Sequence, residues 1–227
     1  MTLRSAISLR NSLRDRDLQS PSSHTLLLET IKCEDGIVSN LKYHQQRFNQ
    51  SRQELYDITD TIDLASILQA PKQGLYRCRV LYAQTIQSIE YIPYQEKNIQ
   101  SLKIVPSSLD YHLKYANRES FNTLLSVHSD VDDVIIEKEG YLTDTSIANI
   151  AFYDGKQWVT PTHPLLNGTM RQKLLDEGFL QTRNIKKEDL RHYTHVALTN
   201  AMVGFKVYNL KSFDLAYKAL KIEPCDF

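Results

Sequence analysis

The sequence predicts an α+β fold, because apolar residues alternate along some segments and recur every three or four residues along others, without a strict βαβ order. Its 227 residues are enough for one large or two small domains. With 41% hydrophobic and 24% charged residues, the composition is that of a globular protein and excludes wholesale disorder. We expect an arm over residues 1–23, a small α/β domain over 24–97 and a larger domain over 98–227.

The first 23 residues differ in character from the rest of the chain. Arginine and serine dominate them, as in an organelle transit peptide, but Asp15 and Asp17 count against that assignment. They also lack the continuous apolar stretch of a secretory signal. We therefore interpret residues 1–23 as a mobile or loosely packed arm.

Strand and helix patterns follow one another through the expected N-terminal domain. Asp35-Gly36 is a hairpin signal after the first apolar run, and Pro71 and Gly74 end the second helical pattern. The polar stretch 95–100 is the best candidate for a linker between domains. The patterns predict strands over 24–33, 75–82 and 86–94, and helices over 41–55 and 59–68.

The expected C-terminal domain is richer in strands than in helices. Asp154-Gly155 is a tight-turn signal between two of the strands, and Gly178 stands where a glycine ends a helix. The patterns predict strands over 102–105, 133–137, 147–153, 157–160, 181–185, 194–199 and 206–210, and helices over 117–127, 169–177 and 213–222.

Charge and cysteine content argue against several classes of function. Basic and acidic residues both number 27, and a net charge of zero argues against a protein that binds a nucleic-acid backbone. No apolar run reaches the roughly 18 residues that a membrane helix needs. Three widely spaced cysteines without a CxxC motif indicate neither a disulfide framework nor a zinc site, and they favour a reducing, cytoplasmic setting.

One lysine lies in a setting that would change its chemistry, although none of the general motifs GxGxxG, GxSxG or HExxH occurs in the chain. Lys114 lies between Tyr111 and Tyr115, where partial desolvation would lower the pKa of its amine and make the amine a nucleophile. The alternative is an ordinary surface lysine.

Two further features add an anion site and an acid. The run NGTM at 167–170 opens a predicted helix, where free backbone N–H groups would bind an anion or simply start the helix. Asp144, between two predicted strands, is either a turn residue or the partner of a buried cation. A nucleophilic amine, a phosphate site and a carboxylate are the three parts that pyridoxal phosphate requires, but spacing alone does not establish that cofactor.

At these positions the chain resembles the class IV, or fold type IV, pyridoxal-phosphate enzymes over roughly residues 26–210. That family includes branched-chain aminotransferases, D-amino-acid aminotransferases and 4-amino-4-deoxychorismate lyase. Seven ordered blocks carry the resemblance, and together they imply a two-domain D-amino-acid-aminotransferase-like fold. The blocks are LLLETIK (26–32), NLKYHQQRFNQS (40–51), LYRCRVLY (75–82), LKYANRES (113–120), GYLTDTSIANIAF (140–152), VTPTHPLLNGTMRQKLL (159–175) and ALTNAMVGFKV (197–207).

The resemblance implies pyridoxal 5′-phosphate as the cofactor. It makes Lys114 the Schiff-base lysine and proton shuttle, Arg47 a donor to the cofactor phosphate, and Asp144 the acid beside the pyridine nitrogen. The other cofactor-binding residues that it implies are Glu29 and Thr30 at the pocket entrance, Gly168, Thr169 and Met170 in the phosphate-binding turn, and Asn200 as a phosphate-side or substrate-side polar residue.

The substrate side of the site is less defined. Arg77 and Arg79 lie two apart on one predicted strand, hence on one face, and the resemblance implies that one of them binds a substrate carboxylate, with Arg79 the better match. Asp144 stands where the family usually has Glu, and it is shorter by roughly 1.5 Å. The family's first strand-and-turn segment is not recognisable in residues 1–23.

Within the family, the blocks LKYANR, TSIANIAF, NGTMRQ and LTNAM look most like 4-amino-4-deoxychorismate lyase. That enzyme eliminates pyruvate from aminodeoxychorismate and leaves 4-aminobenzoate for folate. One alternative is a small aminotransferase acting on branched-chain or D-amino acids. Another is a cofactor-free paralogue with a binding or structural role, which the departure at Asp144 and the missing first segment of the family motivate. The resemblance also implies a homodimer that acts on a small molecule.

Overall fold

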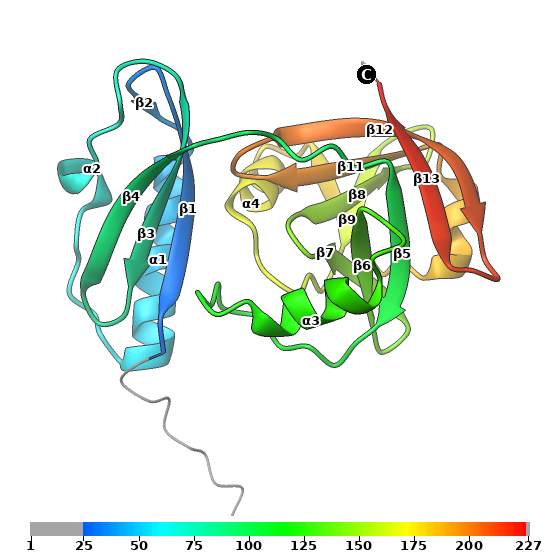
Figure 1. Cartoon of the computed structure of the whole chain (residues 1–227), viewed down its shortest axis with the longest axis horizontal. Helices are drawn as coiled ribbons and strands as arrows, with labels where there is room; N and C mark the ends of the chain where they lie inside the picture. The colour runs from blue at the N-terminus through cyan, green and yellow to red at the C-terminus, as the bar shows by residue number, and fades with distance from the viewer. Residues whose placement is uncertain (1–24, 226–227) are drawn as a thin grey trace, which may run out of the picture.

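The computed structural model describes residues 25–225, in which the strands form two separate sheets (Figure 1). The smaller sheet has four strands in the order β2-β1-β3-β4, and all its pairings are antiparallel. Its elements are β1 (Leu27–Glu34), β2 (Ile37–Val38), α1 (Leu41–Tyr56), α2 (Leu64–Ile67), β3 (Leu75–Tyr82) and β4 (Ile86–Pro93). Residues 1–23, for which the sequence predicts a mobile or loosely packed arm, lie outside the described residues.

Helix α1 covers one face of the small sheet through a stripe of apolar side chains. Phe48 of α1 is fully buried and lies in one apolar cluster with Leu27, Ile31 and Val80 of the strands. The turn between β1 and β2 has Asp35 at φ 48° and Gly36 at φ 83°, which is the left-handed backbone that the Asp-Gly signal predicts. The small sheet therefore follows from local sequence signals.

The larger sheet has nine strands in the order β10-β9-β8-β11-β12-β13-β5-β6-β7. Its strands are β5 (Ser101–Pro106), β6 (Asp133–Lys138), β7 (Tyr141–Thr145), β8 (Asn149–Tyr153), β9 (Trp158–Pro161), β10 (Leu180–Arg183), β11 (His195–Asn200), β12 (Gly204–Asp214) and β13 (Ala219–Pro224). Its helices are α3 (Glu119–Val127), α4 (Thr169–Asp176) and the 3₁₀ helix η1 (Lys187–His192). Within residues 25–225, no helix combines the length and apolar character needed to cross a lipid bilayer.

A further pairing between β7 and β8 closes the larger sheet on itself into a barrel. The register of this pairing places Asp144 of β7 opposite Asn149 of β8. Their side chains also meet, because Asn149 Nδ2 donates to Asp144 Oδ1 at 2.7 Å. The closing pair of the barrel is therefore made of two polar residues that are both almost fully buried.

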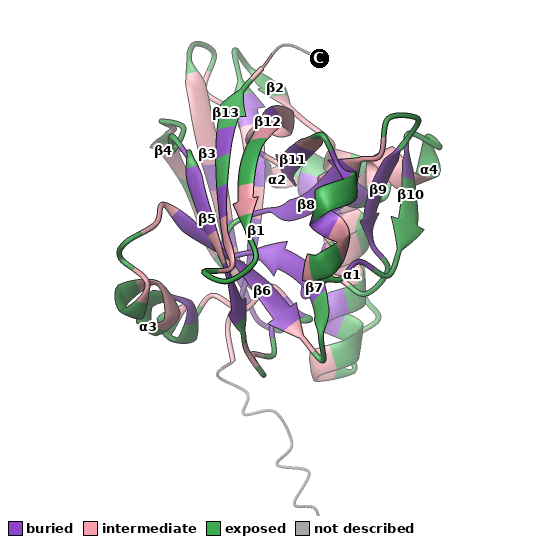
Figure 2. Cartoon of the chain, turned by 90° about the vertical axis from the view of Figure 1, so that its right-hand side faces the viewer, coloured by how far each residue is buried: buried purple, intermediate pink, exposed green. Residues whose placement is uncertain are grey.

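Apolar side chains on the inward faces of the strands fill the barrel. Leu102, Ile135, Ile150 and Leu220 are fully buried in one cluster that spans the closed sheet. Figure 2 shows this burial along the strands, whereas much of α3 is exposed. The interior of the barrel is therefore a packed apolar core.

The last predicted helix is wrong, because residues 213–222 form the end of β12 and most of β13. Leu220 and Ile222 lie two apart and are both buried in the barrel, which is strand spacing. The reversal between the two strands contains Lys218 at φ 52°, a backbone conformation that no helix interior adopts. In the sequence, the apolar residues on the two sides of this turn have the three- and four-residue spacing of a helix, which explains the wrong prediction.

Two other predictions need correction at their boundaries. The helix expected over 59–68 shortens to α2, because the Asp63 carboxylate accepts from the Ala65 N–H and caps the helix there. Asp144 does not lie between strands but within β7, which the sequence analysis missed because the small and polar residues of 141–145 lack an alternating pattern.

Replacing Asn149 by Ala tests whether the closing pair of the barrel stabilises the fold. Asn149 Nδ2 also donates to the Leu166 carbonyl at 2.8 Å, so the change leaves two buried acceptors short of a donor. We expect the free energy of unfolding to fall by about 1–3 kcal/mol in urea denaturation. Asn122→Ala on the exposed side of α3 is the control, with an expected change within about 0.5 kcal/mol. Equal losses in the two variants would contradict this account.

Candidate active site

A cavity of about 500 Å³ lies between the two sheets. This volume falls within the roughly 300–1,000 Å³ of typical small-molecule sites. Its walls come from β1 and β3 of the small sheet, segments 111–121 and 144–149, the start of α4 and the turn after β11. Both sheets are therefore needed to form it.

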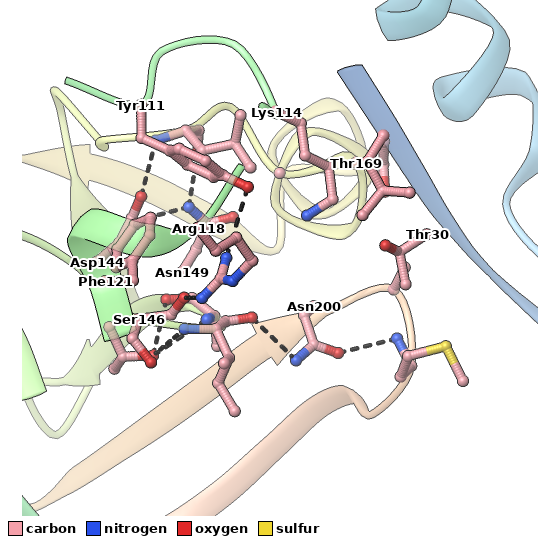
Figure 3. Close-up of a pocket in the computed structure, with 18 of the residues that line it drawn as sticks. Thr30, Tyr111, Lys114, Arg118, Phe121, Asp144, Ser146, Asn149, Thr169 and Asn200 are labelled. Carbon is pink, nitrogen blue, oxygen red and sulfur yellow. Dashed lines mark hydrogen bonds between the residues drawn. The ribbon is translucent and has the colours of Figure 1, made fainter. Parts of the chain in front are cut away.

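The backbone around Lys114 is bound to the first strand of the small sheet. The Leu28 N–H donates to the Lys114 carbonyl at 2.9 Å, and the Ala116 N–H donates to the Leu26 carbonyl at 2.8 Å. Leu27 also forms an isolated antiparallel bridge with Tyr115. These bonds fix the backbone from which the Lys114 side chain points into the cavity (Figure 3).

The environment of Lys114 favours its neutral amine. Burial and then the positive charge of Arg47 lower the pKa of Lys114 to about 7, against the opposing effect of Glu29. A large fraction of the amine is therefore unprotonated at neutral pH, and an unprotonated amine can act as a nucleophile or a base. This is the condition that the sequence analysis set for Lys114.

Arg47 and Glu29 form a two-point ion pair at one end of the cavity. Arg47 Nε donates to Glu29 Oε1 at 2.8 Å, and Arg47 Nη2 donates to Glu29 Oε2 at 2.6 Å. Burial raises the pKa of Glu29, but Arg47 and His44 outweigh it and lower the pKa to about 2. Glu29 is thus a fixed anion that orients the guanidinium group.

The start of α4 lies beside Arg47. Arg47 Nη1 donates to the Asn167 carbonyl at 3.3 Å, and Thr169 Oγ1 lies 3.3 Å from His44 Nε2. The N-cap residue of α4 is Gly168, which has no side chain to accept from the free N–H groups of the helix. A Cβ at Gly168 would lie 1.9 Å from Asn149 Oδ1, so the close packing of this turn requires glycine. An arginine and a helix N-terminus at one place suit a phosphate group.

Asp144 provides the acidic group of the cavity. Its Oδ1 accepts from Asn149 Nδ2 at 2.7 Å, and its Oδ2 accepts from the Leu166 N–H at 2.8 Å. Burial raises the pKa of Asp144 to about 6, although both donors favour the charged form. The carboxylate is therefore ionised at neutral pH, and its position is fixed by donors on β8 and on the loop before α4.

Two arginines of β3 line the cavity with different partners. Arg79 pairs with the exposed Glu90 at 3.2 Å. Arg77 Nε is buried and has no hydrogen-bond partner within residues 25–225. The resemblance favours Arg79 as the residue for a substrate carboxylate, whereas the geometry favours Arg77, because Arg77 lines the cavity and, unlike Arg79, forms no ion pair with a carboxylate of residues 25–225.

Most of the predicted site residues meet in this one cavity. Glu29 does not line it, contrary to the prediction, because β1 alternates and places Thr30 toward the cavity and Glu29 toward α1. Met170 also lies outside the lining, one residue further into α4. The predicted residues that line the cavity are Thr30, Arg47, Arg77, Arg79, Lys114, Asp144, Gly168, Thr169 and Asn200.

Asn200 lines the cavity and also holds its own turn together. Its Oδ1 accepts from the backbone N–H groups of Met202 and Val203 at 2.8 and 3.0 Å, and its Nδ2 donates to the Ile147 carbonyl at 3.3 Å. The side chain therefore ties the turn after β11 to the segment between β7 and β8.

Sequence reasoning missed His44 and Arg118. His44 is fully buried between Glu29 and Thr169, and its place one helical turn before Arg47 was a usable signal. Arg118 lines the cavity, donates to the Ser146 carbonyl at 2.7 Å and lies over the Phe121 ring at 4.5 Å. No pattern around Arg118 marks it, since the contact with Ser146 joins segments far apart in the chain.

Comparison with known proteins finds one family and several similar chains. The amino-transferase class IV family model matches residues 26–207. An uncharacterized protein of Haemophilus influenzae is 38% identical over 184 residues, which are 78% of this chain and 98% of the relative.

Two solved structures are similar to most of this chain. The crystal structure of a "putative 4-amino-4-deoxychorismate lyase" from Haemophilus somnus is 38% identical, with a TM-score of 0.74, and the match covers 80% of this chain and 98% of that one. The PLP-bound form of a hypothetical aminotransferase from Mycobacterium tuberculosis is 18% identical, with a TM-score of 0.65, and the match covers 89% and 85% of the two chains.

The lowered pKa of Lys114 predicts an unusual pH dependence of its reactivity. In the cofactor-free protein, acetylation of Lys114 by acetic anhydride should reach half its maximal rate near pH 7, because only the neutral amine reacts. The rate should fall below that pH and level off above it. Peptide mass spectrometry measures the modification at each pH. A midpoint near the ordinary lysine value of about 10.4 would show that the amine is solvated.

Proposed function

The chain belongs to the class IV aminotransferase family, and from this premise we propose that it is a pyridoxal-phosphate-dependent 4-amino-4-deoxychorismate lyase. The reaction cleaves aminodeoxychorismate into 4-aminobenzoate and pyruvate. One observation carries the proposal: the desolvated Lys114 amine shares a single cavity with an anion site and an ionised carboxylate. The similarity to the Haemophilus somnus protein supports the choice of a lyase.

The residues present fit pyridoxal phosphate. Arg47 and the uncapped start of α4 supply donors for a phosphate, and Asp144 supplies an anion for a protonated ring nitrogen. Gly168 keeps the turn in the cradle free of a side chain, where a Cβ would collide with Asn149. When bound, the cofactor supplies an electron-accepting ring that stabilises negative charge on the substrate.

Lys114 has the properties of the proton-transfer group. Its amine is neutral often enough at pH 7 to accept the proton from the substrate carbon that bears the amino group. The adjacent carbon–oxygen bond then breaks, the ring becomes aromatic, and the three-carbon unit leaves as enolpyruvate. The protonated amine can then return a proton to this leaving group, which becomes pyruvate.

A class IV aminotransferase is the second candidate, because Lys114, the anion site and Asp144 serve amino-group transfer equally well. The two reactions differ in where Lys114 delivers its proton. The family resemblance also supports a homodimer, which we include in the proposal.

Incubating the protein and pyridoxal phosphate with aminodeoxychorismate tests the proposal. We expect 4-aminobenzoate and pyruvate in equal amounts, and we expect Lys114→Ala to lower the rate by at least about 10²-fold. Lys156→Ala, which removes an exposed lysine, should retain the wild-type rate. Transfer of amino groups to 2-oxoglutarate without 4-aminobenzoate would favour the aminotransferase. Inactivity in both assays would favour a non-catalytic paralogue.

The different partners of Arg77 and Arg79 predict different kinetic effects. Arg77→Gln should raise KM for a carboxylate substrate by about 10- to 100-fold with little change in kcat, because Arg77 lines the cavity without a carboxylate partner among residues 25–225, so the change removes its positive charge from the substrate. Arg79→Gln should raise KM by less than about fivefold, since Arg79 already pairs with Glu90. Steady-state kinetics of both variants measure these effects. The opposite order would assign the carboxylate to Arg79.

A further inference from the structure

A buried chain of three side chains connects the small sheet to the anion site. His44 is fully buried on α1, with Nδ1 2.6 Å from Glu29 Oε2 on β1 and Nε2 3.3 Å from Thr169 Oγ1 at the start of α4. Glu29 in turn holds Arg47. His44 therefore touches, directly or through Glu29, both side chains that face a phosphate at this end of the cavity.

The chemistry of Glu29 determines where the proton of His44 lies. Glu29 is an anion over the whole physiological range, so it can only accept, and His44 Nδ1 must carry hydrogen. Burial lowers the pKa of His44 and outweighs Glu29, which raises it. The ring is therefore neutral at neutral pH. A neutral ring with hydrogen on Nδ1 has a lone pair on Nε2, and the Thr169 hydroxyl donates to it.

A phosphate group changes this arrangement. The Thr169 hydroxyl has one hydrogen, and while that hydrogen is directed at His44 the hydroxyl meets the phosphate only with lone pairs. A proton added to Nε2 reverses the bond: the ring donates to Thr169 Oγ1, and the hydroxyl hydrogen becomes available to a phosphate oxygen. Two negative charges on the phosphate also favour the imidazolium.

We propose that His44 is a positioning residue for the cofactor phosphate, and that phosphate binding is coupled to the uptake of one proton from solvent at His44 Nε2. The inference rests on the proposed function, because it takes the phosphate to be that of the cofactor. The charged and titratable groups around His44 are Glu29 from β1, Arg47 from α1 and Lys114 from the segment before α3. Arg47 and Lys114 oppose the added charge, and Glu29 and the phosphate favour it.

Pyridoxine 5′-phosphate and pyridoxine are suitable probes, because neither has an aldehyde that can react with Lys114. Titration calorimetry at about pH 8, in buffers of different ionisation enthalpy, counts the protons taken up on binding. We expect uptake of close to one proton per pyridoxine 5′-phosphate and close to none for pyridoxine. Uptake of no proton with the phosphate ester would overturn the inference.

Two variants locate the proton. His44→Gln replaces the ring by an amide that does not titrate, and Thr169→Val keeps the shape of the side chain but removes the hydroxyl. Both variants should abolish the proton uptake and weaken binding of pyridoxine 5′-phosphate about 10-fold or more. Neither should have much effect on the binding of pyridoxine. Thr169→Val leaves the Glu29–His44 pair in place and so remains informative where His44→Gln fails to fold. Gln46→Ala on the exposed side of α1 is the matched control and should behave as wild type.

The outcomes separate this inference from the proposed function. Binding of pyridoxine 5′-phosphate with proton uptake retained in Thr169→Val would place the proton elsewhere and overturn the role of His44. Binding without any uptake would overturn it as well, yet leave the cofactor site intact. Failure of both pyridoxine 5′-phosphate and pyridoxal phosphate to bind would overturn the proposed function itself.

Discussion

Lys114 lies half-buried where the two sheets meet, and burial together with the positive charge of Arg47 lowers the pKa of its amine. Backbone hydrogen bonds with Leu26 and Leu28 fix the segment that carries the lysine. A lysine at an exposed position would stay charged at neutral pH and could neither attack a carbonyl nor accept a proton. The reactivity of the cavity thus depends on a contact between the sheets, which neither provides alone.

The hydrogen bonds that hold Asp144 and Arg47 in the cavity also connect the main elements of the fold. Asn149 binds Asp144 across the closing pair of the barrel and also binds the Leu166 carbonyl, so it joins β7, β8 and the loop before α4. Glu29 compensates the charge of Arg47 from behind the cavity wall. Anion site, carboxylate and amine therefore have fixed relative positions, which is the preorganisation that electrostatic catalysis requires.

Local signals predicted much of this molecule, and long-range contacts explain where prediction failed. Short runs of sequence predicted the Asp35-Gly36 turn and the Gly178 helix end, and they marked Lys114 and the turn at 167–170 as candidate site residues. Arg47 was predicted only through the resemblance to the class IV family, and it lines the same cavity. The helix predicted over 213–222 failed because only the barrel partners of Leu220 and Ile222 decide that they alternate. His44 and Arg118 escaped the same analysis, since their contacts with Thr169 and with the Ser146 carbonyl form only when segments far apart in the chain come together.

The most direct test of the account is chemical fixation of the cofactor. Protein incubated with pyridoxal phosphate should show visible absorbance that borohydride abolishes, and peptide mass spectrometry should then find the reduced pyridoxyl group on Lys114. Attachment to another cavity lysine such as Lys97, or no attachment at all, would contradict the central claim that Lys114 is the amine that holds this cofactor.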